Sequence, residues 1–359
     1  MEITKETYFK RQTTLAELGK EGQNLLQKAK VLVIGCGGLG SPIAIYLAAS
    51  GIGNLHLVDF DTVSVSNLHR QVFFKVEDVK LPKAEVLANE IKKRAPFTKV
   101  TFTNKAVSKN SILELISNYD VVVDGTDSLP VKYLINDACV LLKKPLVYGS
   151  LYKFDGYVAT FNQQNDDGTF SCNLRDAFPK IATDIPNCEA AGTLNPIVGI
   201  IALLQVNEVL KLITKTGKLL INQLLIYNAL ENSQFKMKLR KNESIDIDEI
   251  FNNSDYLETF CETQDVALLI SASEFKKINT KRNIEVISVL NHLDAPIPFK
   301  VHQKMPYKTF DVEKFKPDFN KQYVVVCKKG ITSYDVTLKL KQKHPTLSVF
   351  SLIDGIEKY

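Results

Sequence analysis

The stretch "VLVIGCGGLGSP", residues 31–42, decides the fold of this protein. An apolar, strand-forming run ends at Gly35, and three further glycines precede a helical pattern: Gly37, Gly38 and Gly40. Small residues between a strand and a helix let backbone amides approach phosphate groups at the positively polarised helix start. The stretch therefore predicts a Rossmann-like α/β fold with a phosphate-binding loop.

Strand and helix patterns alternate on both sides of this loop. Strand-like runs include "KVLVIG", "NLHLVDFD", "KVTFTNKAV", "DVVVDGTD" and "PLVYGS", and helical patterns separate them. This rhythm indicates a mainly parallel sheet covered by helices on both faces.

The pattern changes after residue 156. An irregular stretch at residues 166–193 is followed by an apolar helix pattern at residues 195–213 and by the hairpin-like "LLIYNALENSQFKMKLRKN". The uninterrupted apolar run of the helix is too short to span a bilayer, so we expect a buried core helix. The added material suggests a site built over the carboxyl edge of the sheet.

Length and composition limit the classes of protein. A chain of 359 residues exceeds the usual size of a single core, which predicts two domains. We place a linker at the polar, acidic residues 242–265, between a first domain at residues 1–241 and a smaller α/β domain at residues 266–359.

Charge and cysteine content predict the compartment. The net charge of +5 is spread thinly, which argues against a nucleic-acid partner. The charged start "MEITKETYFKR" has no signal-peptide pattern, and six cysteines in a chain of this length form no disulfide framework. We therefore expect a cytoplasmic protein with no membrane association.

Acidic, amide and cationic residues follow the phosphate loop. Asp59 comes 19 residues after Gly40 at the end of the next strand, where a carboxylate can bind ribose hydroxyls. By itself this also fits an NAD(P)-dependent oxidoreductase. The stretches "DFDTVSVSNLHRQ" and "KLPKAEV" add more polar groups: Asp61, Asn67, Arg70, Gln71 and Lys83. A dinucleotide needs little of this cationic equipment, whereas a triphosphate does, so the pattern favours ATP.

Five motifs in order carry a family resemblance. They are "GCGGLGSP", "DFDTVSVSNLHRQ", "LPKAE", "DGTDS" and "CEAAGTLNPIVG". Together, from about residue 8 to residue 241, they resemble the MoeB and ThiF branch of the ubiquitin-activating-enzyme superfamily. The resemblance implies a homodimeric enzyme that uses ATP and Mg²⁺ to adenylate the C-terminal glycine of a small ubiquitin-like sulfur-carrier protein of the MoaD/ThiS type. Pyrophosphate is the product released.

The resemblance suggests a role for each candidate residue. Attack by a carboxylate on a phosphate requires charge neutralisation and alignment, for which we select Arg70 and Lys83. Asp127 in "DGTDS" is the expected Mg²⁺ ligand, with Asp61 as a second candidate. Ser128 replaces the asparagine usual in the family. Arg11 in "YFKRQ" matches an arginine that reaches the phosphates of the neighbouring subunit, so it implies a dimer.

Two cysteines of the first domain match functional positions in the family. Relatives commonly hold zinc with two Cys-x-x-Cys pairs, but here Cys172 begins "CNLR" and "RKNESIDID" has no cysteine, so we predict no zinc site. Cys188 matches a cysteine that attacks the acyl adenylate or takes part in acyl-disulfide exchange. A purely structural role for Cys188 is equally open.

The end of the chain resembles a divergent rhodanese domain. In "VVVCKKGITS", Cys327 begins a Cys-x-x-Gly-x-x-Ser loop that could cradle a persulfide with backbone amides, aided by Lys328 and Lys329. The front half lacks the Asp-x-Arg segment, because Ser-Val-Leu stands at residues 288–290. The domain therefore predicts either sulfur transfer through Cys327 or a degenerate docking module.

Several functions are compatible with these features. The favoured one is carrier adenylation in sulfur delivery for molybdopterin or thiamine biosynthesis, with a cysteine desulfurase or another sulfur donor as partner. An adenylating enzyme for a peptide or a ubiquitin-like modifier, with a docking domain only, is the alternative within the same class. A non-catalytic scaffold for a carrier protein is the alternative outside it.

Overall fold

The structure is a computed structural model that describes residues 3–179, 192–254, 256, 266–279, 281–291, 296–328, 330–353 and 355–359. It divides into two compact units, Met1–Tyr256 and Leu257–Tyr359. Each unit is α/β, and the predicted fold class with a large, mainly parallel sheet is confirmed.

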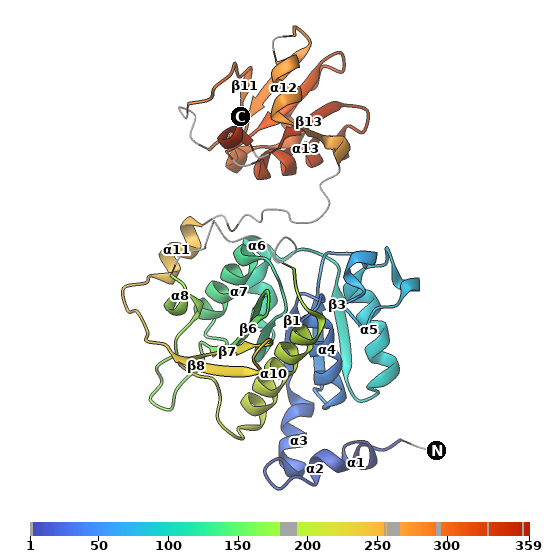
Figure 1. The fold of residues 1–359 in the computed structure, drawn as a ribbon, viewed down its shortest axis with the longest axis vertical. Helices are drawn as coiled ribbons and strands as arrows, with labels where there is room; N and C mark the ends of the chain where they lie inside the picture. Colours follow the sequence, from blue (N-terminus) through green and yellow to red (C-terminus); the bar gives the residue numbers. More distant parts are fainter. Residues whose placement is uncertain are drawn as a thin grey trace. The chain divides into compact units, whose positions relative to one another are not determined.

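The first unit is built around an eight-stranded sheet in the order β3-β2-β1-β4-β5-β6-β7-β8 (Figure 1). The first five strands in this order pair in parallel, and the pairs from β5 to β8 are antiparallel. The strands are β1 (Lys30–Ile34), β2 (Asn54–Val58), β3 (Lys99–Thr103), β4 (Val121–Asp124), β5 (Leu146–Tyr152), β6 (Asp155–Phe161), β7 (Gln223–Asn228) and β8 (Ser233–Lys238).

Helices cover both faces of this sheet. The crossover helices α4 and α5 share one hydrophobic core with α10, whereas α6 and α7 enclose a second core on the opposite face. The α-helices among the described residues of this unit are α1 (Lys5–Tyr8), α2 (Lys10–Thr13), α3 (Gly19–Lys28), α4 (Gly40–Ala49), α5 (Lys83–Arg94), α6 (Lys109–Ser117), α7 (Leu129–Leu141), α8 (Leu174–Ala177), α10 (Asn195–Thr214) and α11 (Ile247–Asn253).

The strand order reverses between β1 and β4. From β1 the chain proceeds to β2 and β3 on one side, then crosses to β4 and β5 on the other. In open α/β sheets this reversal leaves a crevice at the carboxyl ends of the two central strands, which is where ligands bind. The glycine loop predicted from the sequence follows β1 at this point.

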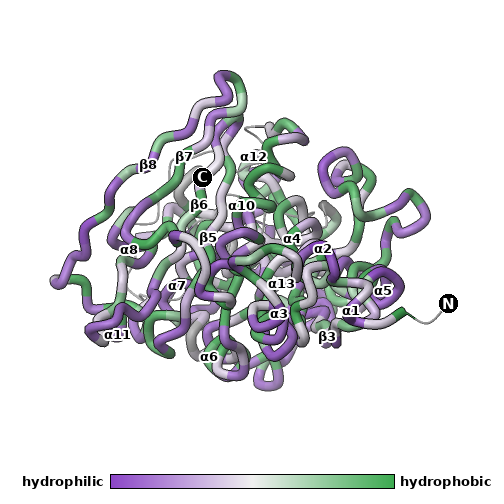
Figure 2. The backbone as a smooth tube through the Cα atoms, turned by 90° about the horizontal axis from the view of Figure 1, so that it is seen from below, coloured by the Kyte–Doolittle hydropathy of each residue, from purple (hydrophilic) through white to green (hydrophobic). Residues whose placement is uncertain are grey.

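Helix α10 is buried on one face. It packs against α4, β5 and β6. Helices α4 and α10 are rich in hydrophobic residues, whereas α5 is mainly hydrophilic (Figure 2). Among the described residues, α10 is the one helix with the length and composition to cross a membrane, and half of its apolar window is buried in the protein. The sequence predicted a core helix, but the outer face of α10 is only partly covered, with Leu203 37% exposed.

The first unit extends beyond the boundary expected from the sequence. We placed a linker from residue 242, yet α11 lies against α7 and Tyr256 is buried in the core of the first unit. The acidic, polar composition that indicated a linker instead reflects an amphipathic surface helix, in which only Ile247 and Phe251 are buried.

The second unit contains a five-stranded sheet in the order β11-β10-β12-β13-β9, with parallel pairing throughout. Helix α13 packs on β12 and β13. The elements are β9 (Leu269–Ile270), α12 (Ala272–Ile278), β10 (Ile284–Ser288), β11 (Gln303–Lys304), β12 (Gln322–Val326), α13 (Ile331–Lys343) and β13 (Ser348–Leu352).

Candidate active site

Two loops meet backbone to backbone at the reversal of strand order. A Cβ atom on Gly35, whose φ is +88°, would lie 2.7 Å from the carbonyl of Gly125. A Cβ on Gly40 would lie 1.7 Å from the Gly35 oxygen. These contacts require glycine, since any side chain would separate the loop after β1 from the loop after β4. The site is therefore assembled from residues about 90 positions apart in the sequence.

Asp59, at the end of β2, holds the glycine loop in place. Its Oδ2 accepts a hydrogen bond from the Cys36 amide at 2.6 Å, and its Oδ1 accepts one from the Asp61 amide at 2.8 Å. Burial raises the pKa of Asp59 to about 6, although nearby Lys83 opposes the shift. Each carboxylate oxygen keeps a further lone pair, so Asp59 can still accept from the hydroxyl groups of a ligand.

Lys83 forms a buried ion pair with Asp61. The Nζ atom lies 2.9 Å from Oδ2 of Asp61, and only 3% of the lysine side chain is exposed. The Lys83 amide also donates to the Asp61 carbonyl. The pair places a cation at the first residue of α5, next to Asp59. Asp61, our second candidate for a Mg²⁺ ligand, therefore has one carboxylate oxygen already paired with Lys83.

The segment between β2 and α5 contributes three more predicted residues. Asn67 is buried and its Oδ1 accepts from the Ser64 hydroxyl, whereas the half-buried Arg70 donates to the Ser66 carbonyl. The Gln71 side chain lies against the glycine loop, since a Cβ on Gly37 would be 3.3 Å from its Nε2. The Oε1 atom of Gln71 is buried and has no hydrogen-bond partner among the described residues. Such an atom favours a bound ligand that donates to it.

Asp127 is an exposed carboxylate beside the glycine loop. It comes two residues after Gly125, which contacts Gly35, and immediately precedes Ser128, the N-cap of α7. Oxygen ligands next to a phosphate-binding loop suit Mg²⁺. Asp127 and the glycine loop are therefore compatible with a magnesium nucleotide.

A second buried ion pair lies beneath this loop, and sequence reasoning missed it. Asp124, the last residue of β4, is fully buried and its Oδ2 lies 3.0 Å from Nζ of Lys132 on α7. An acid at the end of a buried strand followed by a lysine in the next helix was the available signal. Of the two aspartates in "DGTDS", the sequence motif indicated a role only for Asp127.

Arg11 lies far from this site within its own chain. Arg11 belongs to α2. The next residue of this helix, Gln12, donates a hydrogen bond to the carbonyl of Ser50, the C-cap residue of α4. Tyr8 likewise donates to the carbonyl of Arg94 at the end of α5. Because α4 and α5 start at the carboxyl edge of the sheet, their ends lie at the opposite edge, where Figure 1 also shows α1 and α2.

An ion pair lies in the region that, by the family resemblance, corresponds to the zinc site of relatives. Arg175 binds Asp137 through two parallel hydrogen bonds, at 2.8 Å from Nε and 2.6 Å from Nη2. Tyr256 donates to the same carboxylate at 2.5 Å. Cys172 is buried, and burial raises the pKa of its thiol to about 11. Within the described ranges no cluster of three or more metal-ligating side chains occurs. The absence of zinc stays a prediction.

Of the two cysteines that are candidates for sulfur chemistry, the structure describes only Cys327. Cys188 lies outside the described residues, as does Lys329. Cys327 follows β12 and is 3% exposed. Its Sγ accepts from the Gly330 amide at 3.1 Å and lies 3.2 Å from the Ser333 hydroxyl. The sulfur is thus both packed in a core and hydrogen-bonded at the start of α13.

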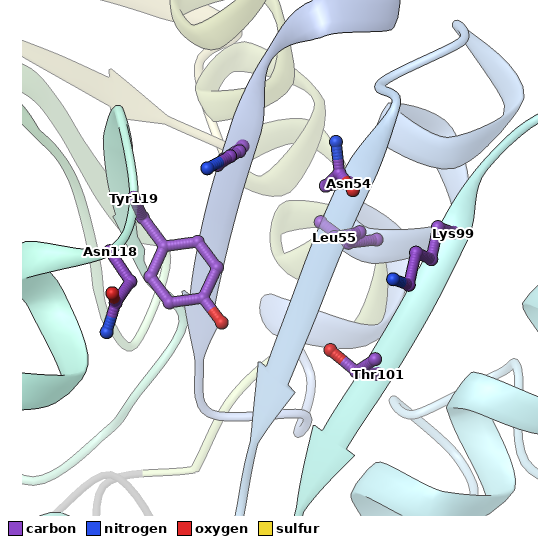
Figure 3. A pocket seen from close by; sticks show the side chains of 7 residues that line it. Asn54, Leu55, Lys99, Thr101, Asn118 and Tyr119 are labelled. Carbon is purple, nitrogen blue, oxygen red and sulfur yellow. The ribbon is translucent and has the colours of Figure 1, made fainter.

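A hollow of about 230 Å³ lies elsewhere on the first unit. It is lined by residues at the amino ends of strands, including Asn54 and Lys99, with Tyr119 beside them (Figure 3). Since the loops described above extend from the carboxyl ends, this hollow is not part of the candidate active site.

Comparison with known proteins gives a consistent result. A model of the ThiF family matches residues 9–246. A sulfur carrier protein adenylyltransferase of Thermus thermophilus is 41% identical over 246 residues, covering 67% of this chain and 91% of that protein. The probable adenylyltransferase/sulfurtransferase MoeZ of Mycobacterium tuberculosis is 39% identical, and the match spans 70% of this chain but 64% of MoeZ.

Solved structures resemble the first unit in fold. The complex of Escherichia coli MccB with MccA-N7isoASN has a TM-score of 0.60 at 22% identity, covering 68% of this chain and 75% of that one. MccB with ATP has a TM-score of 0.56 at 23% identity, covering 64% of this chain and 69% of that one. At these identities the likeness shows the fold alone.

Proposed function

Because the chain belongs to the ThiF family, we propose that it adenylates the C-terminal glycine of a small ubiquitin-like sulfur-carrier protein at the expense of ATP. Support comes from the convergence of the glycine loop, Asp59, Lys83 and Asp127 at the reversal of strand order. The relatives named as sulfur carrier protein adenylyltransferases support the choice of substrate. An oxidoreductase would leave the Lys83 and Asp127 groups without a common purpose.

The reaction requires alignment more than proton transfer. A carboxylate oxygen of the carrier attacks the α-phosphorus of ATP, the bond to the bridging oxygen breaks, and pyrophosphate leaves with that electron pair. The carrier's carboxylate is already ionised at neutral pH, so no strong general base is needed. Asp59 binds the ribose, and Lys83 and Arg70 stabilise charge on the phosphates. Asp127 would hold Mg²⁺, which would supply charge neutralisation at the phosphates.

The active assembly in this proposal is a homodimer. Arg11 is exposed at the sheet edge opposite to its own glycine loop, so a role in phosphate binding requires the site of a second copy. Exposed apolar side chains on α3, α4 and α10 offer a surface for that copy, namely Leu25, Tyr46 and Leu203. A closed two-fold arrangement would complete both sites.

The second unit supplies sulfur in this proposal. Cys327 carries a persulfide whose outer sulfur attacks the carbonyl carbon of the acyl adenylate, so that AMP leaves and an acyl disulfide forms. A second thiol, for which Cys188 is the candidate, then attacks the Cys327 sulfur, forms a disulfide with it and releases the thiocarboxylate. The observation in favour is the hydrogen bonding of Cys327 Sγ to the Gly330 amide and its proximity to Ser333. The donor of the sulfur is a persulfide-forming enzyme such as a cysteine desulfurase. A docking role without sulfur transfer is the alternative.

The experiment is exchange of labelled pyrophosphate into ATP, measured with and without a carrier protein that ends in Gly-Gly. Removing one charge partner of a transition state costs a few kcal/mol, so Asp127→Ala should slow exchange by roughly 100-fold or more. Asp167→Ala removes an exposed carboxylate in a remote turn and should leave exchange unchanged. Exchange at the wild-type rate in Asp127→Ala would refute the assigned site, and exchange that needs no carrier would refute the substrate.

A further inference from the structure

We propose that the buried Asp124–Lys132 ion pair is a positioning device for the Asp127 loop, and that it sets the Mg²⁺ dependence of ATP binding. The inference rests on the function proposed above. Lys132 and Asp124 are both buried, and they bond to each other, to the Gly149 carbonyl and to Thr126, so we assign them a positioning role and no direct contact with ATP or the carrier.

One oxygen of Asp124 shapes the turn that leads to Asp127. Oδ1 accepts from the Thr126 amide at 2.9 Å and from the Thr126 hydroxyl at 2.7 Å. Both bonds bend the backbone directly after β4, in the manner of a side-chain-stabilised turn. The next residue is Asp127, so the direction in which its carboxylate points depends on this turn.

The other oxygen of Asp124 is held by Lys132. Its Nζ donates to Oδ2 at 3.0 Å and to the Gly149 carbonyl at 2.7 Å, and it lies 5.2 Å from the centre of the Tyr148 ring. One side chain therefore connects α7, the end of β4 and β5. The turn cannot rotate without breaking a bond to a buried charge.

A third element fixes the same point from the opposite face. Gln205 on α10 donates through Nε2 to the Asp124 carbonyl at 2.8 Å. A Cβ atom on Gly149 would lie 2.1 Å from Gln205 Oε1, so glycine is required for this approach. The end of β4 is thus held on both faces of the sheet, whereas Asp127 three residues later is exposed.

A buried ion pair contributes little net stability compared with well-packed apolar residues, because both charges must lose their water. Stability alone therefore does not account for a charged pair at this place. Groups that orient a metal ligand without touching the metal typically change metal affinity by about 10-fold to 100-fold when they are removed. The Asp124–Lys132 pair has the position of such a group.

The first unit offers a matched control. Asp137 and Arg175 form a second buried ion pair that also involves α7, with Asp137 fully buried and Arg175 5% exposed. This pair joins α7 to α8 and Tyr256, and it makes no contact with the Asp127 loop in the described bonds. Losing it should affect stability in the same way as losing the Asp124–Lys132 pair.

The test measures ATP affinity by calorimetry, with Mg²⁺ present and with the metal removed by EDTA. Lys132→Met should weaken ATP binding in Mg²⁺ by about 10-fold or more and leave binding in EDTA within about twofold. Lys132→Arg should restore most of the Mg²⁺-dependent affinity. Arg175→Met should leave both affinities within about twofold, whatever its melting temperature.

Each other outcome has a definite meaning. If Lys132→Met does not fold, Thr126→Val, which keeps the ion pair and loses one bond to Asp124, should show a smaller loss confined to Mg²⁺. Equal losses with and without the metal, or the same loss in Arg175→Met, would overturn the inference. If wild-type ATP binding is independent of Mg²⁺, the proposed metal role is wrong; if it depends on Mg²⁺ and Lys132→Met keeps that dependence, only the positioning role is wrong.

Discussion

Replacing Asp59 with asparagine should leave the protein at least as stable as the wild type at neutral pH, while it weakens ATP binding. Burial raises the pKa of Asp59 from 3.8 to about 6, so the fold favours the protonated acid. The shift of about 2 pH units means that ionised Asp59 costs the folded state roughly 3 kcal/mol at neutral pH. This penalty is absent below about pH 4, grows as the pH rises from about 4, and is complete once the pH has passed the folded pKa of about 6.

The substitution also has a cost. The shift of the Asp59 pKa already includes the hydrogen bonds from the Cys36 and Asp61 amides, which favour the ionised carboxylate. The protonated acid keeps a hydroxyl oxygen that can still accept from one of these amides, whereas asparagine places an amide group there. An amide left without an acceptor costs about 1–3 kcal/mol. We therefore expect Asp59→Asn to be neutral or up to about 2 kcal/mol more stable than the wild type at pH 7, and less stable than the wild type at pH 4.

The assay is urea denaturation followed by far-ultraviolet circular dichroism at several pH values. The difference in unfolding free energy between Asp59→Asn and wild type should change by about 2 kcal/mol in favour of the variant between about pH 4 and about pH 6.5. Since other carboxylates titrate in both proteins, this difference isolates Asp59. ATP affinity of the wild type should fall as pH drops below about 6. A stability difference that does not vary with pH would refute the reasoning.

Three further predictions concern the dimer, zinc and sulfur. Mixing Arg11→Ala with Lys83→Ala protein should restore up to about one active site in four by statistical subunit exchange, and no recovery after demonstrated exchange would exclude action across the interface. Elemental analysis should find no stoichiometric zinc, and chelators should leave the melting temperature unchanged, because Arg175 replaces the second cysteine of the expected pair and is bonded to Asp137; one zinc per chain would contradict this. Cys327→Ser should abolish thiocarboxylate formation from a persulfide donor and leave pyrophosphate exchange intact, whereas wild-type thiocarboxylate yield would favour a docking role.

Local sequence determined much of the first unit. The strand that ends at Gly35, the glycines that follow and the acid at the end of the next strand were predicted correctly, because each depends on residues close together in the chain. The alternation of apolar strands and amphipathic helices likewise predicted a parallel sheet, since each element must bury one face. Close similarity over five spaced motifs then indicated the ThiF family, which the family match confirms.

Composition was a poor guide where a segment folds only against another. Residues 242–256 are polar and acidic, so they were interpreted as a linker, yet Tyr256 donates to the carboxylate of Asp137, which lies 119 positions earlier. Helix α11 has few buried residues, and its position depends on packing against α7. Neither contact leaves a periodic signal in the sequence of that segment.

The sequence by itself determined which chemical groups lie at the ends of the strands, because strand ends follow from local apolar patterns. Only the tertiary structure decided how those groups are held. The bonds from Lys132 to Gly149, from Gln205 to Asp124 and from Arg175 to Asp137 join residues 17, 81 and 38 positions apart. These contacts form because charged and amide groups that are buried in a shared core need partners, since an unpaired polar atom there is costly. No sequence pattern within a single helix or strand indicates which partner each group will have.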